Sequence, residues 1–296
     1  MMGRVTSAAQ AIEVVGLRKV YGDREALRGL DFSVARGEVF GLLGPNGAGK
    51  TTTVEVLEGY RERDGGEVRV LGEDPGARGT RLRERVGVVL QSCGTYPHLT
   101  VQETLEHWAT LYPAPRPVAE VLALAGLEEV AARRARVLSG GQLRRLDFAL
   151  ALIGDPELIF LDEPTTGFDP AARRAAWDVV RALRDLGKTV VLTTHYLDEA
   201  QALADRVAIV KDGRVLAEGP PDALGATRYR VAWRDDAGSI AERFTDDPTA
   251  LLHELTSAAL ARGEQLEELS VTRPSLEDVY LELTTAADEP APAVPA

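Results

Sequence analysis

A glycine-rich segment carries the clearest chemical signal in the sequence. It matches the spacing G-x-x-x-x-G-K-T and consists of Gly44, Pro45, Asn46, Gly47, Ala48, Gly49, Lys50 and Thr51. Glycines allow the backbone to turn successive N–H groups toward phosphate oxygens, and a helix starting at the end of the loop adds partial positive charge. The spacing predicts that Lys50 reaches the β- and γ-phosphates of a nucleotide and that the Thr51 hydroxyl ligates Mg²⁺.

The residues on either side of this loop support that interpretation. The apolar run Val39–Leu43 before it is typical of a strand buried in a parallel sheet, and a helix is predicted from Thr52 onward. A strand, a glycine-rich loop and a helix in this order form the context in which the motif binds phosphate. We therefore count Thr52 among the nucleotide-binding residues.

Two adjacent carboxylates, Asp162 and Glu163, follow a second apolar run, Leu158–Leu161. Metal-assisted hydrolysis needs such a pair, because one carboxylate can hold the Mg²⁺ shell while the other polarises the attacking water. We assign the first role to Asp162 and the second to Glu163. Taken alone, the pair could equally be two solvated acids at a strand end. A phosphate-binding loop in the same domain favours the catalytic interpretation.

A second predicted anion site lies at the start of another helix, in the segment Ser139, Gly140, Gly141 and Gln142. The serine hydroxyl and the glycine amides at a helix N-terminus attract an anion. One nucleotide does not need two such sites in one chain. The economical explanation is that Ser139 and Gly141 meet the γ-phosphate bound by another subunit.

Among the four histidines, His195 is the candidate for a role in the chemistry. It follows the apolar run Thr189–Thr193, so it stands at a predicted strand end, from which its ring can donate a hydrogen bond to the γ-phosphate. A lone histidine is usually structural, and that is our interpretation of His98, His107 and His253.

Strands and helices alternate along most of the chain, which predicts an α/β domain with a largely parallel sheet. Near residue 225 the pattern changes to alternation at 229–233, helical spacing at 251–259, alternation at 266–271 and helical spacing at 276–283. We predict a main domain over 1–223 and a small β-α-β-α domain over 224–285. Residues 286–296 contain three prolines and no basic residue, which predicts a disordered tail.

Composition narrows the class of protein. The chain has 296 residues, 46 acidic against 34 basic side chains and a net charge of −12, which argues against nucleic-acid binding by broad phosphate neutralisation. The single cysteine, Cys93, excludes an internal disulfide framework and fits a reducing compartment. No apolar run reaches the roughly 18 residues of a membrane-spanning helix. The polar stretch Met1–Gln10 is not expected to be a secretory signal.

Together the motifs resemble the ATP-binding subunits of ABC (ATP-binding cassette) transporters over about residues 12–221. Residues 44–51 resemble the Walker A loop, Leu158–Glu163 the Walker B strand and Leu138–Gln142 the signature motif, in the order of the family. The resemblance implies an α/β P-loop NTPase cassette, whose parallel-sheet core carries an antiparallel β subdomain and a helical subdomain. A small α+β C-terminal domain would follow it.

The resemblance also assigns roles to residues that the motifs above do not cover. Gln91 matches the Q-loop glutamine, which in the family touches Mg²⁺ and faces the membrane partner. Asp169 matches the D-loop, His195 the switch histidine, and Tyr21 the aromatic residue that stacks on adenine. Phe168 stands where leucine is commoner, and the helical segment before the signature is short and holds three prolines, so the docking details of the partner are open.

The implied function is an ATPase subunit that binds MgATP in a head-to-tail dimer, or beside a paired cassette. It would drive a separate membrane permease from the cytoplasmic face of the cell membrane. The ending 274–283 and the segment 193–200 resemble single-cassette exporters of the drug-resistance, nodulation and cytochrome-maturation branch. That branch implies export of a drug-like or hydrophobic molecule. We see in the small domain a docking or dimer-stabilising module.

Two other classes remain to be weighed. A soluble cassette ATPase acting in DNA repair, on ribosomes or in cofactor assembly usually carries tandem cassettes, coiled-coil insertions or a basic surface, which this chain does not show. A small GTPase-like switch would lack the segment Leu138–Gln142 and would need a guanine-reading motif, which we do not find.

Overall fold

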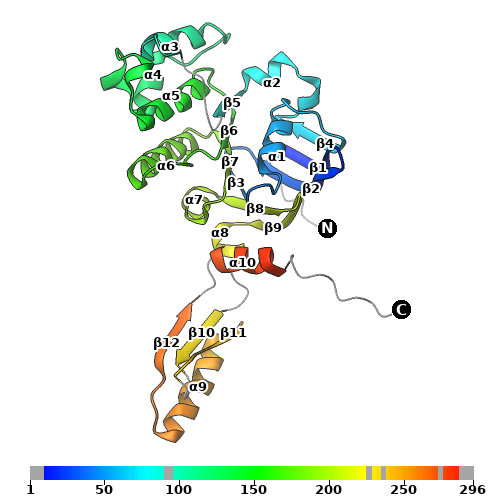
Figure 1. Ribbon diagram of the computed structural model, residues 1–296, viewed down its shortest axis with the longest axis vertical. Coiled ribbons are helices and arrows are strands. Elements are labelled where there is room, and N and C mark those ends of the chain that lie inside the picture. The colour runs from blue at the N-terminus through cyan, green and yellow to red at the C-terminus, as the bar shows by residue number, and fades with distance from the viewer. Residues whose placement is uncertain (1–9, 90–95, 225–228, 235–237, 273–275, 287–296) are drawn as a thin grey trace, which may run out of the picture. The chain divides into compact units, whose positions relative to one another are not determined.

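The chain divides into two compact units, Met1–Glu218 and Gly219–Ala296, which are described separately (Figure 1). The computed structural model describes residues 10–89, 96–224, 229–234, 238–272 and 276–286. The predicted tail therefore lies, from residue 287 onward, outside the described residues.

A six-stranded sheet forms the centre of the first unit. Its spatial order is β5 (Val86–Val89), β6 (Leu158–Asp162), β7 (Thr189–Thr194), β3 (Val39–Leu43), β8 (Arg206–Lys211) and β9 (Arg214–Gly219). The first five of these strands pair in parallel. Parallel pairing brings the carboxyl ends of β3, β6 and β7 to the same edge of the sheet, although more than a hundred residues separate β3 from β6 in the chain.

Successive side chains of the central strands enter two different cores. On β6, Leu158 and Phe160 pack in one core, while Ile159 and Leu161 pack in the other. This is why the apolar runs are continuous rather than alternating, since both faces of the sheet are covered.

One core lies between this sheet, a three-stranded antiparallel sheet and two helices. The antiparallel sheet has the order β2-β1-β4, and these elements are β1 (Gln10–Tyr21), β2 (Arg24–Ala35), β4 (Gly65–Val70), α1 (Lys50–Leu57) and α2 (Thr80–Glu84). Tyr21 and Arg24 stand at the tight turn between β1 and β2. The antiparallel sheet thereby carries an aromatic ring to the neighbourhood of the loop that precedes α1.

The other core is helical. It is built from α3 (Val101–Ala109), α4 (Val118–Ala125), α5 (Gly140–Leu152) and α6 (Pro170–Asp185), with α7 (Leu197–Leu203) at its margin. In Figure 1, α3, α4 and α5 lie together at one end of the first unit, away from the antiparallel sheet. The helical segment before the signature consists of α3 and α4, because the three prolines separate them, and residues 128–130 and 135–137 form only 3₁₀ turns.

Side chains define where the two functional helices of this layer begin. Ser139 and Gln142 form a capping box, in which the Ser139 hydroxyl accepts a hydrogen bond from the Gln142 N–H and the Gln142 side chain accepts one from the Ser139 N–H. Asp169 caps α6 by accepting hydrogen bonds from the N–H groups of Ala171 and Ala172, and Pro170 follows at the first helical position.

The second unit is a small α+β structure. It contains α8 (Pro221–Leu224), β10 (Tyr229–Arg234), β11 (Ile240–Thr245), α9 (Pro248–Arg262), β12 (Glu267–Thr272) and α10 (Leu276–Ala286), with an antiparallel sheet of order β11-β10-β12. The predicted order β-α-β-α omits one strand. The structure has β11 between β10 and α9, so the order from residue 229 onward is β-β-α-β-α. The side chains of β11 are largely exposed, so the apolar alternation that reveals a half-buried strand is weak there.

Phe160 on β6 is completely buried against the core of the antiparallel sheet. We expect Phe160→Ala to lower the free energy of unfolding by about 3–5 kcal/mol, because a large apolar side chain is replaced by a cavity. Urea denaturation followed by circular dichroism measures the change. Val15→Ala, at a position that is 61% exposed on β1, should cost less than about 0.5 kcal/mol. Equal effects of the two substitutions would contradict the assigned core.

Candidate nucleotide-binding site

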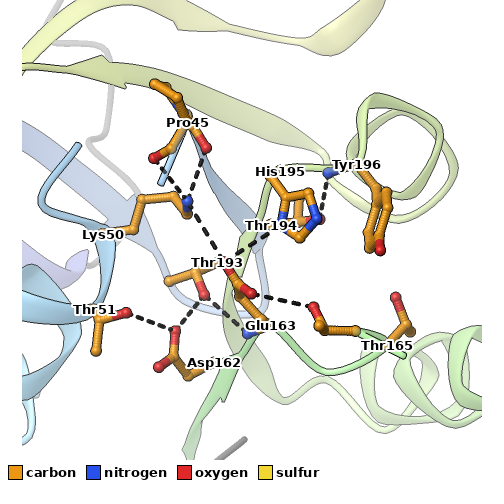
Figure 2. Close-up of polar contacts among 12 residues, drawn as sticks. Pro45, Lys50, Thr51, Asp162, Glu163, Thr165, Thr193, Thr194, His195 and Tyr196 are labelled. Atoms are coloured by element: carbon orange, nitrogen blue, oxygen red, sulfur yellow. Dashed lines mark hydrogen bonds and ion pairs between the residues drawn. The ribbon is translucent and has the colours of Figure 1, made fainter. Parts of the chain in front are cut away.

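Polar side chains from three strand ends meet at the carboxyl edge of the parallel sheet (Figure 2). The glycine-rich loop follows β3, Asp162 ends β6 with Glu163 next in the chain, and His195 follows β7. Open parallel sheets bind ligands at this edge, because the loops there leave the sheet in different directions and expose their backbone.

Close packing explains two of the loop's glycines. A Cβ on Gly44 would lie 2.2 Å from the backbone oxygen of Val210 on β8, so no larger residue fits there. Gly49 has φ 106° and a Cβ at this position would lie 2.7 Å from Leu27, which excludes a side chain both by conformation and by space. The loop is therefore held against β8 and β2.

Lys50 is the cation at the centre of the site. Its Nζ donates hydrogen bonds to the backbone oxygens of Gly44 at 2.8 Å and Pro45 at 3.2 Å, and lies 3.6 Å from Oε1 of Glu163. Burial lowers the pKa of the Lys50 ammonium, while the carboxylates of Glu163 and Asp162 oppose that lowering. The ammonium is thus a nearly buried charge that contacts both the carbonyl groups of the loop and the carboxylate of Glu163.

Asp162 faces two hydroxyl groups. The Thr193 hydroxyl donates a hydrogen bond to its Oδ1 at 2.5 Å, and the Thr51 hydroxyl lies 3.4 Å from the same oxygen. Hydroxyl and carboxylate oxygens are the ligands that Mg²⁺ prefers. No group of three or more His, Cys, Asp or Glu side chains within the described residues could hold a metal ion by itself. The donor set therefore fits Mg²⁺ held by few protein ligands together with phosphate oxygens and water.

Glu163 is fixed by four partners. Its backbone N–H donates to the Thr193 hydroxyl at 2.9 Å, and its Oε2 accepts a hydrogen bond from the Thr166 hydroxyl at 3.1 Å. Its Oε1 lies 3.4 Å from Nδ1 of His195, in addition to the contact with Lys50. The backbone of Glu163 has φ 45°, a strained conformation for a residue other than glycine, and such strain often accompanies a functional site.

Lys50, Thr51, Asp162 and Glu163 line a cavity of about 620 Å³, a size suited to a nucleotide. His195 contacts Glu163 but does not itself line the cavity. Nine of the residues predicted to bind nucleotide, metal or water line it, namely Tyr21, Asn46, Gly47, Gly49, Lys50, Thr51, Thr52, Asp162 and Glu163. Gly44, Pro45 and Ala48 belong to the same loop but do not line the cavity. Tyr21 is 39% exposed, so part of its ring is available for stacking.

The predicted second anion site lies elsewhere on the chain. None of residues 139–142 lines the cavity, and neither does Asp169. Ser139 and Gly140 are exposed, and space is open around the α-carbons of Gly140 and Gly141. The capping box satisfies the Gln142 N–H, but the first N–H groups of α5 have no carbonyl partner within the helix. The segment presents donors outward, away from the cavity of its own chain.

Gln91, predicted to touch Mg²⁺, lies outside the described residues, as does Cys93.

Comparison with known proteins decides the family. A family model described as ABC transporter matches residues 27–166. Nod factor export ATP-binding protein I of Rhizobium sp. (strain N33) is 40% identical over 93% of this chain and 97% of its own length. The daunorubicin/doxorubicin resistance ATP-binding protein DrrA of Streptomyces peucetius is 40% identical over 94% of each chain. The chain belongs to the ATP-binding proteins of ABC transporters.

Solved structures of this family share the fold. The ATP-binding subunit of an ABC transporter superposes with a TM-score of 0.68 at 25% identity, covering 93% of this chain and 99% of that one. The protein cbiO1 of Clostridium perfringens, part of the ABC transporter complex cbiONQ, gives 0.67 at 28% identity over 73% of this chain and 90% of its own. The predicted P-loop NTPase cassette is confirmed, and the chain is an ABC transporter ATP-binding subunit, an ATPase coupled to transport. Within its described residues no helix is long and apolar enough to cross a membrane.

Sequence analysis missed three residues of this site. Arg24 and Ala26 line the cavity from the start of β2, and Thr193 bonds to both catalytic-site acids from the end of β7. Thr193 appeared in the sequence only as part of an apolar run. Its position beside Asp162 follows from the pairing of β6 with β7, which places these two residues in register.

A third acid, Glu58, follows α1 near the carboxylate of Asp162, and its burial predicts a pH dependence of stability. Burial, followed by the nearby carboxylates of Asp162 and Glu55, raises the pKa of Glu58 to about 8, and its Oε1 is buried with no hydrogen-bond partner among the described residues. The native state thus keeps a proton that the unfolded chain, with its ordinary value of 4.5, releases. The contribution of Glu58 to the stability of the metal-free protein therefore falls as the pH rises from about 4.5 to about 8, and this contribution does not change further above that range.

We expect Glu58→Gln to remove this fall and to be more stable than the wild type above pH 8. One pKa unit corresponds to about 1.4 kcal/mol, so the gain is at most about 5 kcal/mol. Urea denaturation in EDTA at a series of pH values measures it. Glu62→Gln, whose side chain is 74% exposed nearby, is the matched control and should leave the pH profile unchanged. A Glu58→Gln profile parallel to that of the wild type would contradict the burial of a protonated carboxyl.

Proposed function

We propose that the chain binds and hydrolyses MgATP in a head-to-tail dimer and thereby drives a separate membrane permease, which exports a drug-like or hydrophobic molecule. The single observation that carries the ATPase part is the convergence of Lys50, Thr51, Asp162, Glu163 and His195 at one edge of the parallel sheet. These are the side chains that a phosphate-binding and water-activating site requires.

In this proposal the phosphate loop and Lys50 bind the β- and γ-phosphates, and adenine stacks on Tyr21. Thr51 and Asp162 hold Mg²⁺, which neutralises phosphate charge when bound, and Gln91 joins them on the basis of its motif alone. The 3.4 Å separation between the Thr51 hydroxyl and Asp162 supports the metal assignment, because both oxygens face the same point.

Glu163 is the proposed base that orients the attacking water. Glu163 lines the cavity, and its carboxylate contacts both Lys50 and His195. Phosphate oxygens compete with Glu163 for the Lys50 ammonium, so a bound nucleotide frees the carboxylate to accept a hydrogen bond from water. His195 is then placed to donate a hydrogen bond to the γ-phosphate.

The signature segment is the reason for proposing a dimer. The N–H groups of Gly140 and Gly141 and the Ser139 hydroxyl lie at the start of α5, outside the cavity of their own chain, while the capping box already uses the N–H groups of Ser139 and Gln142. A partner subunit's nucleotide gives these donors an anion, and Asp169 is expected at the same interface. A solved relative with a TM-score of 0.63 at 28% identity is described as a dimeric ATP-binding cassette bound to ADP and Pi, which supports this arrangement.

The relatives suggest the direction and class of transport. Their names refer to export of Nod factor and to resistance to daunorubicin and doxorubicin. From these names we infer, for this chain, export of a drug-like or hydrophobic molecule through a permease. The subunit would then act from the cytoplasmic face of the cell membrane, attached through the permease.

Glu163→Gln tests the assignment of the base. We expect kcat for ATP hydrolysis to fall at least about 100-fold while the affinity for ATP is kept, because the amide cannot accept a proton from water. Phosphate release and binding of a fluorescent ATP analogue measure the two quantities. Glu157→Gln, at the other end of the same strand region and paired with Arg85, is the matched control and should retain wild-type turnover. Wild-type hydrolysis by Glu163→Gln would refute the assignment.

Transport itself is tested with inside-out membrane vesicles that contain the proposed permease partner. We expect ATP-dependent accumulation of a fluorescent anthracycline when the wild-type subunit is added, and none with Glu163→Gln. If the purified subunit hydrolyses ATP but neither binds such vesicles nor energises uptake, the non-transport cassette class is the better assignment.

A further inference from the structure

We propose that Tyr196 is a positioning residue for the switch histidine and that Arg173 holds Tyr196 in place from the start of α6. The proposal rests on the role of His195 given above, and it assigns a task to two residues that the nucleotide-binding motifs do not include. The partners of Tyr196, rather than its place in the sequence, lead to it.

The side chains of His195, Tyr196 and Arg173 form a stack. The ring centroids of His195 and Tyr196 are 4.1 Å apart with planes tilted by 39°, a close aromatic contact between neighbours in the chain. Figure 2 shows the two rings beside each other on the segment that follows β7. The guanidinium of Arg173 lies over the Tyr196 ring, 4.5 Å from its centroid. The Tyr196 ring is therefore in contact with an imidazole and with a cation.

Backbone hydrogen bonds fix where Tyr196 can place its ring. Its N–H donates to the hydroxyl of Thr194 at 2.9 Å, and Thr194 is completely buried. Its carbonyl accepts a hydrogen bond from the Ala200 N–H at 3.2 Å, which begins α7. These bonds hold the backbone of Tyr196 in place, and the contacts of the ring with His195 and Arg173 then hold the side chain.

Arg173 is oriented for stacking. Its Nη1 lies 3.2 Å from Oδ2 of Asp198 in the first turn of α7, which holds the guanidinium over the ring. Its Nε is buried with no hydrogen-bond partner among the described residues. A guanidinium placed for hydrogen bonding alone would use that N–H, whereas a guanidinium placed face-on over an aromatic ring need not.

The stack joins the switch histidine to the segment around Asp169. Arg173 lies in the first turn of α6, whose start is fixed by Asp169 through its bonds to the N–H groups of Ala171 and Ala172. A second contact holds the same two helices together, because Oε1 of the buried Glu199 on α7 accepts hydrogen bonds from Thr165 and from Trp177 on α6. A displacement of the first turn of α6 is therefore transmitted through Tyr196 to the imidazole of His195.

Substitution of Tyr196 tests the stack directly. Tyr196→Ala should lower kcat for ATP hydrolysis about 10- to 100-fold, because the imidazole is no longer held in place, with KM for ATP within about twofold of the wild type. Tyr196→Phe keeps the ring and should retain activity close to that of the wild type. If Tyr196 had a merely structural role, its substitution would not lower kcat while KM stays nearly unchanged.

A double substitution shows whether Tyr196 acts through His195. Tyr196→Ala added to His195→Ala should cause no further loss of kcat, since the group that Tyr196 positions is already absent. If the two losses multiply instead, Tyr196 acts independently and the proposal is wrong. If His195→Ala alone leaves kcat unchanged, the proposed role of His195 fails, and the positioning proposal falls with it.

Arg173 has a matched control on its own helix. Arg173→Ala should reproduce the kcat loss of Tyr196→Ala in part, by about 3- to 10-fold. Arg181→Ala, which breaks the exposed ion pair between Arg181 and Asp178 two turns further along α6, should have no effect. Equal activity of the Arg173 and Arg181 variants would overturn the part of the proposal that assigns Arg173.

Nuclear magnetic resonance gives a readout that does not depend on turnover. A ring 4.1 Å away shifts the imidazole proton resonances of His195, which His195→Ala identifies among the four histidines. Tyr196→Ala should move the His195 resonances and leave those of the other three in place, whereas Tyr196→Phe should leave all four in place. Unmoved His195 resonances in a folded Tyr196→Ala protein would overturn the proposal.

Discussion

Parallel pairing of β6, β7 and β3 is the constraint on which the site depends. It aligns Asp162 with Thr193 and Leu43 with Thr194, so the residues that follow each strand leave the sheet at one edge. A shift of two residues along any of these strands would move its polar end by about 7 Å, which is more than any contact in the site can absorb. Apolar side chains on both faces maintain the register, because a strand that slips exposes them.

Charges within the site are balanced by neighbouring protein groups rather than by solvent. Lys50 is nearly buried and shares its environment with two carboxylates, while Glu58 keeps a proton near neutral pH and so does not add a third. Hydroxyl groups of Thr51, Thr166 and Thr193 complete the set as donors to the acids. A polyphosphate entering this cavity meets an ammonium and backbone amides that are already oriented, which lowers the reorganisation needed for binding and catalysis.

In the proposed dimer, the two helical elements beside the sheet extend the site beyond one chain. The start of α5 presents the signature segment outward, and the start of α6 is capped by Asp169. Because the Arg173–Tyr196–His195 stack and Glu199 join α6 to α7, the region expected to face a partner is mechanically connected to the histidine of the hydrolytic site.

Local residue patterns determined the phosphate loop, the paired acids at the end of β6 and the α/β class, because glycine spacing and continuous apolar runs have local physical causes. Family resemblance supplied the roles of Tyr21 and Asp169. The strand β11 escaped prediction because its side chains face solvent and leave no apolar alternation. Tertiary structure alone decided that Thr193 bonds to Asp162, that Arg24 lines the cavity and that Arg173 covers Tyr196. Each of these contacts joins residues far apart in the chain, and only the order and register of the packed elements bring them together.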